Sequence, residues 1–147
     1  MMIDTVAAWH QLVQHHNTAG LDTLLADTVV FHSPIVHTPQ AGKAATAMYL
    51  TAAFHVFFNE TFRYVREVVG SRDAVLEFIV EIDGISVNGV DMIAWDDTGR
   101  ITEFKVMIRP LKAITLIHQK MAAMLPVARG PAAGRPVTTA GERGKTG

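Results

Sequence analysis

The chain has 147 residues, of which 49% are hydrophobic and 18% are charged, and it contains no cysteine. This composition predicts one compact domain with a hydrophobic core and excludes disulfides and thiolate chemistry. The formal charge of -1 leaves no basic footprint for nucleic acid or for an anionic membrane surface, so we expect neither as a partner. No apolar run is long enough to span a membrane and no secretory signal is recognisable, which favours a soluble, cytoplasmic protein.

The first part of the chain predicts three helices and one strand. Asp4 can cap a first helix, and a short second helix should cover 21–26. β-branched and aromatic residues predict a strand over 29–33, and an unbroken alanine-rich segment predicts a helix of about four turns over 43–58. The buried stripe of this long helix should include Ala45, Tyr49, Ala52 and Val56.

Four strand-like segments joined by short turns follow the long helix. They cover 61–70, 74–82, 85–95 and 101–109, and a closing helix should span 111–125. Short turns join antiparallel neighbours, so the pattern predicts an α+β domain, residues 1–125, in which helices cover one face of a curved antiparallel sheet. The remaining segment, 126–147, is rich in Gly, Pro and Ala without apolar periodicity, and we expect it to be a flexible tail.

Asp91 is the most informative polar residue of the chain. Strand alternation places it on the same face as Val87, Ile93 and Trp95, among large apolar groups rather than other charges. A carboxyl group in such surroundings must accept a hydrogen bond, retain its proton or face a cavity. The alternatives are therefore a structural carboxylate and a group that points into a pocket.

The same alternation predicts an apolar pocket for a small hydrophobic or polycyclic ligand. Tyr49 could line this pocket and donate a hydrogen bond to Asp91, although core packing explains Tyr49 equally well. The other residues expected to line the pocket are Phe31, Ser33, Leu76, Phe78, Val80, Val87, Ile93, Phe104, Val106 and Ile108.

The order of elements and the segment VDMIAWDDTGRITEF resemble the nuclear transport factor 2-like superfamily, which includes ketosteroid isomerases, SnoaL-like polyketide cyclases and limonene epoxide hydrolase. The resemblance extends from about residue 4 to 124 and implies a cone-shaped curved sheet with helices over its concave face, as in cystatin-like folds. It places Asp91 on the isomerase aspartate that stays protonated and donates a hydrogen bond to the developing enolate oxygen.

The other catalytic positions implied by the resemblance carry unsuitable residues. The isomerase general base falls at Ser33, which cannot serve as that base, and the isomerase tyrosine falls near Leu12. The acid that the epoxide hydrolase and the cyclases carry on the last strand falls at Val106. The fold of these enzymes is therefore expected here without their usual sets of catalytic residues.

Histidines offer one alternative base and no metal site. His32 lies next to the position of the isomerase base and could abstract a proton if it pointed inward, but alternation places Phe31 and Ser33 on the inner face instead. No pair of histidines has the spacing of metal ligands with a carboxylate nearby, so we expect neither a metal nor another cofactor.

Three functions remain compatible with this pattern. The first is an isomerase- or cyclase-like enzyme that acts on an enolisable ketone through Asp91, with Tyr49 or His32 as candidate partners, and the second is a non-catalytic binder of a small apolar molecule. The third is a protein-interaction module. Superfamily relatives commonly pair through the outer face of the sheet, so we also expect a homodimer. The residues on that face are Glu77, Glu81, Lys105, Met107 and Arg109.

Overall fold

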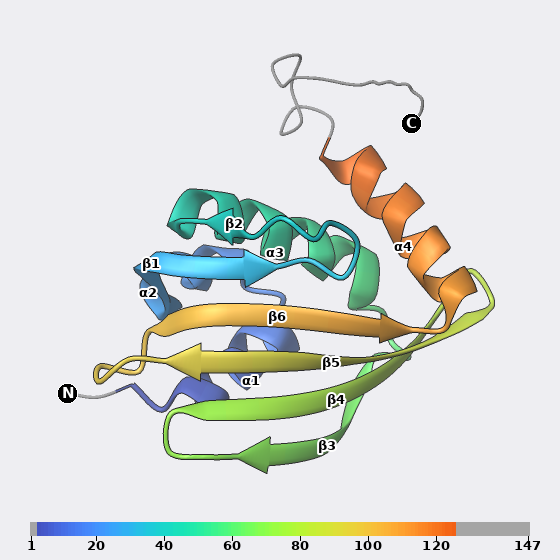
Figure 1. The fold of residues 1–147 in the computed structure, drawn as a ribbon. Coiled ribbons are helices and arrows are strands. Elements are labelled where there is room, and N and C mark those ends of the chain that lie inside the picture. Colours follow the sequence, from blue (N-terminus) through green and yellow to red (C-terminus); the bar gives the residue numbers. More distant parts are fainter. Residues whose placement is uncertain (1–2, 126–147) are drawn as a thin grey trace, which may run out of the picture.

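The computed structural model describes residues 3–125, which form four α-helices and a six-stranded sheet (Figure 1). The helices and a short 3-10 helix are α1 (Thr5–His15), η1 (Thr18–Gly20), α2 (Leu21–Leu24), α3 (Lys43–Phe57) and α4 (Leu111–Met124). The strands are β1 (Leu25–His32), β2 (Gln40–Ala41), β3 (Arg63–Val69), β4 (Asp73–Ile82), β5 (Ile85–Trp95) and β6 (Ile101–Arg109). The predicted tail, 126–147, lies outside the described residues.

The sheet has the strand order β2-β1-β6-β5-β4-β3. β3 to β6 form a run of antiparallel neighbours, while β1 pairs with β6 in parallel and with β2 in antiparallel orientation. Figure 1 shows the curved long strands with α1 behind them and α3 above β6, and α4 beside the end of α3. The α+β architecture with helices over a curved sheet is thus confirmed, and the one parallel pair was not predicted.

Local sequence signals explain most helix boundaries. The Asp4 side chain accepts a hydrogen bond from the backbone N–H of Ala7 and so caps α1, as expected. The helix ends at His15, and the following residue, His16, takes a left-handed conformation with φ of 50° that forms the C-cap. The second helix ends at Leu24, two residues earlier than predicted, because β1 begins at Leu25.

The predicted core stripe of α3 is confirmed in part: Ala52 is buried, and Tyr49 and Val56 are half-buried and pack against buried apolar side chains, but the most deeply buried residues lie on a neighbouring face. In an alanine-rich helix the orientation follows the few large side chains, and these recur every three or four residues on a different face. The buried residues of α3 are Thr46, Leu50, Ala52, Phe54 and Phe57.

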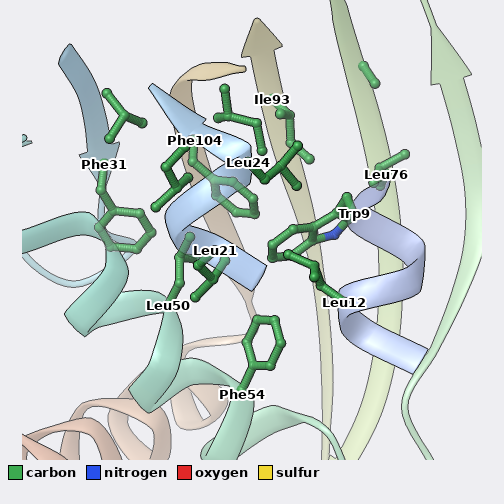
Figure 2. Close-up of a cluster of buried hydrophobic side chains, with 14 residues drawn as sticks. Trp9, Leu12, Leu21, Leu24, Phe31, Leu50, Phe54, Leu76, Ile93 and Phe104 are labelled. Atoms are coloured by element: carbon green, nitrogen blue, oxygen red, sulfur yellow. The ribbon is translucent and has the colours of Figure 1, made fainter. Parts of the chain in front are cut away.

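Buried apolar side chains form two clusters above the sheet. The larger cluster lies under α1, α2 and the middle of α3, where Trp9 packs against Phe104 and Phe54 with ring centroids 4.9 and 5.7 Å apart (Figure 2). The smaller cluster joins the end of α3 and α4 to β4 and β5 through Phe57, Phe78 and other residues. α3 contributes side chains to both clusters, so the clusters meet beneath this helix.

The outer face of the sheet carries the polar residues that alternation predicts. Glu77 forms an ion pair with Arg66, with 3.4 Å between Oε1 and Nε, and Met107 is 49% exposed. The homodimer expected through this face remains a prediction. Within residues 3–125 no helix has both the length and the apolar character needed to cross a membrane.

Candidate functional site

A cavity of about 140 Å³ lies where the two clusters meet. Its walls come from α1, the end of β1 with the loop that follows it, α3, the inner face of the sheet and α4. Most of the lining is aromatic or aliphatic, including Trp9 and Phe54 from the larger cluster and Phe57 and Phe78 from the smaller one. The space is suited to an apolar group that displaces poorly bonded water.

Asp91 is the buried acid of this cavity. β5 alternates as predicted, so the side chain of Asp91 points to the inner face, where it is 7% exposed and contributes to the cavity wall. Its Oδ2 accepts a hydrogen bond of 2.6 Å from the Tyr64 hydroxyl, which in turn accepts one of 2.9 Å from Nε1 of Trp9. No further hydrogen bond to Asp91 occurs within residues 3–125, so its Oδ1 is available to a ligand.

Burial determines the protonation of this pair. Burial raises the pKa of Asp91 from the ordinary 3.8 to about 7, and the hydrogen bond from Tyr64 opposes part of that rise. Burial also raises the pKa of Tyr64 well above the usual 10.0, with a further rise from the neighbouring carboxylates of Asp91 and Glu67. Tyr64 therefore stays a neutral donor, and Asp91 holds a proton through the mildly acidic range.

Tyr64 is the hydrogen-bond partner of Asp91, so of the two alternatives for Tyr49 the hydrogen bond to Asp91 is wrong. Tyr49 lies on the cavity wall but stacks on Phe31, with ring centroids 5.5 Å apart and an interplanar angle of 19°. The signal for Tyr64 was in the strand pairing, since Tyr64 and Phe78 are opposite one another on β3 and β4 and so share the inner face. A bulge in β3 directly after Tyr64 obscures this alternation in the sequence.

The residues predicted to line the pocket fall into two groups: some lie on the cavity wall, and the others are buried in the two clusters. The residues that the structure places on the cavity wall are Phe31, Ser33, Phe78, Phe104 and Val106. The others pack within the two clusters and do not line the cavity: Leu76, Val80, Val87, Ile93 and Ile108. Strand alternation separates inner from outer residues but does not say where the helices leave space.

The residues at and beside the position of the isomerase base, Ser33 and His32, make other interactions in this structure. The Ser33 hydroxyl lies on the cavity wall and accepts hydrogen bonds from the backbone N–H groups of Ile35 and Val36, at 2.9 and 3.2 Å. His32 is not part of the wall, because alternation turns it to the opposite face, where its Nε2 lies 3.0 Å from Oε2 of Glu103. The structure thus gives His32 no route to a ligand in this cavity.

His118 is an ionisable residue of the cavity wall that the sequence did not predict. It lies on α4 directly after the buried Ile117, lines the cavity and is also exposed to solvent. No sequence signal indicates which side of α4 meets the cavity. Within residues 3–125, no three His, Cys, Asp or Glu side chains are grouped so that they could hold a metal ion.

Comparison with known proteins agrees with this architecture. The family model of the SnoaL-like domain matches residues 6–104, which is most of the described chain. This chain belongs to the SnoaL-like domain family. Within it, the chain has the fold of the nuclear transport factor 2-like superfamily, as the resemblance implied. None of the curated proteins gives a significant match.

Two solved structures are similar to this SnoaL-like chain in both sequence and fold. A steroid delta-isomerase from Pseudomonas aeruginosa shares 36% identity with a TM-score of 0.79, covering 84% of this chain and 90% of the isomerase. An uncharacterised protein with a cystatin-like fold from Silicibacter pomeroyi shares 30% identity with a TM-score of 0.78, covering 86% and 89% of the two chains. A nuclear transport factor 2-like protein from Mesorhizobium loti, at 22% identity and a TM-score of 0.63 over 73% of this chain and 89% of that one, supports the fold alone.

The hydrogen-bond chain predicts a specific effect of Tyr64→Phe. Removing the hydroxyl leaves the indole N–H of Trp9, a residue only 1% exposed, without its acceptor, so the free energy of unfolding should fall by about 1–3 kcal/mol. The pKa of Asp91 should also rise further, because the lost hydrogen bond is the one that lowers it. Urea denaturation and carboxyl carbon NMR measure the two effects.

Tyr49→Phe is the matched control for that substitution. Tyr49 lines the same cavity, but its hydroxyl makes no hydrogen bond within residues 3–125, so the loss of stability should stay below about 1 kcal/mol. Equal effects of the two substitutions would contradict the special role of Tyr64.

The raised pKa of Asp91 makes stability depend on pH in a defined direction. Between about pH 4 and about pH 7 the folded protein retains a proton on Asp91 that the unfolded chain has lost, so the free energy of unfolding falls as the pH rises through this window. Asp91→Asn removes this contribution while preserving size. Urea denaturation across the window should show the stability of the variant rising relative to wild type by on the order of a few kcal/mol, since one pKa unit corresponds to about 1.4 kcal/mol. Parallel pH curves for the two proteins would refute the raised pKa.

Proposed function

We propose that the cavity binds a small apolar ketone and that protonated Asp91 donates a hydrogen bond to the ketone oxygen. The observation that carries this proposal is the buried pair itself, in which Tyr64 donates to Oδ2 of Asp91 at 2.6 Å while Oδ1 has no partner within the described chain. A neutral carboxyl group held in an apolar wall is a strong donor to an oxygen that gains negative charge. Its tasks would be to orient the ketone and stabilise its enolate.

The size of the cavity limits the ligand. A volume of about 140 Å³ is close to that of a cavity that holds one benzene ring, and it is below the range of about 300–1,000 Å³ for drug-sized ligands. We therefore propose a ligand that places about one ring inside the cavity. A larger ligand would have to leave its remaining rings outside.

The similarity to a steroid delta-isomerase at 36% identity supports an enzyme that acts on a ketone. The residues at the base positions favour a second candidate, a non-catalytic binder of the same ligand, because Ser33 and Val106 cannot take up a proton there. In both cases Asp91 is the polar anchor. The two candidates differ in whether bound ketone is converted.

Isomerisation of a β,γ-unsaturated cyclohexenone to its conjugated isomer tests the enzyme directly, because the product absorbs in the ultraviolet. A β,γ-unsaturated ketosteroid serves as the large substrate. We expect turnover of the one-ring ketone by the wild type and a fall in kcat of about 10² for Asp91→Asn, the scale of losing one oxyanion donor. Tyr49→Phe is the control within the same cavity and should lower kcat far less.

Phenol binding distinguishes the second candidate. Phenol has the size of one ring, and Trp9 in the cavity wall reports binding through its fluorescence. Binding that weakens in Asp91→Asn, without turnover of either ketone, would favour the binder over the enzyme. Absence of both turnover and phenol binding would contradict the proposed function as a whole.

A further inference from the structure

We propose that His118 is the general base of this cavity and takes the place of the acidic base that the chain lacks on β1. The inference rests on the proposed function and adds the proton acceptor that enolisation requires. The structure brings Ser33, at the end of β1, and His118, on α4, to the wall of one cavity. A base on α4 could therefore reach a ligand whose oxygen is held by Asp91.

Few side chains on this wall can accept a proton. Among the described residues that line the cavity, the ionisable side chains are Asp91, Tyr49 and His118. Asp91 is assigned to the ketone oxygen, and the hydroxyl of a neutral tyrosine such as Tyr49 is a weak proton acceptor. Imidazole is the side chain best suited to accept and return a proton near neutrality.

The position of His118 also fits a base. His118 lines the cavity and is exposed to solvent, so it lies at the mouth of the cavity, whereas Asp91 is buried. It makes no hydrogen bond or ion pair within residues 3–125, which leaves both ring nitrogens uncommitted. The neighbouring side chains of α4 on the wall, Ile117 and Met121, are apolar and would hold the ligand ring between the two polar groups.

The step balances without a co-reactant. A ring nitrogen of His118 takes a proton from the carbon between the carbonyl and the double bond, and the electron pair of that C–H bond forms a new carbon–carbon double bond. The carbonyl π electrons move to the oxygen, which Asp91 stabilises with its hydrogen bond. The protonated imidazole then returns the proton to the far carbon of the original double bond, which gives the conjugated ketone and restores His118.

His118→Ala tests the assignment with the β,γ-unsaturated cyclohexenone. We expect kcat to fall by about 10²–10⁴ with little change in KM, because the base acts on bound substrate, and we expect added imidazole to restore part of kcat. A side chain that only shapes the mouth would change KM and would not respond to imidazole. His55→Gln is the control, since His55 is exposed on α3 and does not line the cavity.

Deuterium exchange into cyclohexanone in heavy water provides a second readout, because it needs the base and Asp91 but no shift of a double bond. Loss of exchange in His118→Ala, with recovery on adding imidazole, supports the base even if the unsaturated ketone is a poor substrate. Wild-type kcat in His118→Ala, together with its loss in Asp91→Asn, overturns the role of His118 and leaves the proposed function intact. Absence of turnover and of exchange in the wild type overturns both.

Discussion

A carboxyl group buried in an apolar wall must be satisfied by hydrogen bonds or remain protonated, and this constraint organises the candidate site. Asp91 meets it in both ways. Tyr64 donates to one oxygen, Trp9 fixes the hydroxyl of Tyr64, and burial favours the protonated carboxyl group. The three residues come from β5, β3 and α1, so the acid is in place only once the sheet has its edge strand and the first helix has packed on it.

The cavity has a related structural origin. Trp9 belongs to the cluster under α1 and α2, while Phe57 and Ile117 belong to the cluster that α3 and α4 make with the β4–β5 hairpin. α3 contributes side chains to both clusters, and the cavity lies where the clusters meet. Asp91 on β5 faces this space from the sheet, and His118 on α4 faces it from the mouth of the cavity. An apolar ring bound between them would meet a polar group at each end.

Local patterns in the sequence were sufficient for most of the helices and strands, but not for the parallel pairing of β1 with β6. The bounds of β5 and β6 agree with prediction, because turn residues flank each strand and alternation fixes its inner face, and Asp91 accordingly lies on that face. Asp4 caps α1 for an equally local reason. The family resemblance added the cone architecture and the comparison of Asp91 with an isomerase aspartate.

Which residues form the site depends on contacts between segments that lie far apart in the sequence. Tyr64 reaches Asp91 across β4, and a bulge in β3 hides the alternation that would have indicated it. Leu76 and Ile93 face inward as predicted, but helices cover them, so they lie in the core rather than on the cavity wall. The side of α4 that carries His118 could not be predicted, because the sequence does not say against which strands a closing helix packs.

Titration of the Asp91 carboxyl carbon by NMR, with Asp91→Asn to assign the signal, tests the central claim most directly. The account predicts a pKa of about 7, caused by burial in the apolar wall and moderated by the hydrogen bond from Tyr64. A pKa near the ordinary aspartate value of about 3.9 would contradict it, because Asp91 would then be ionised at neutral pH and could not donate a hydrogen bond to a ketone oxygen.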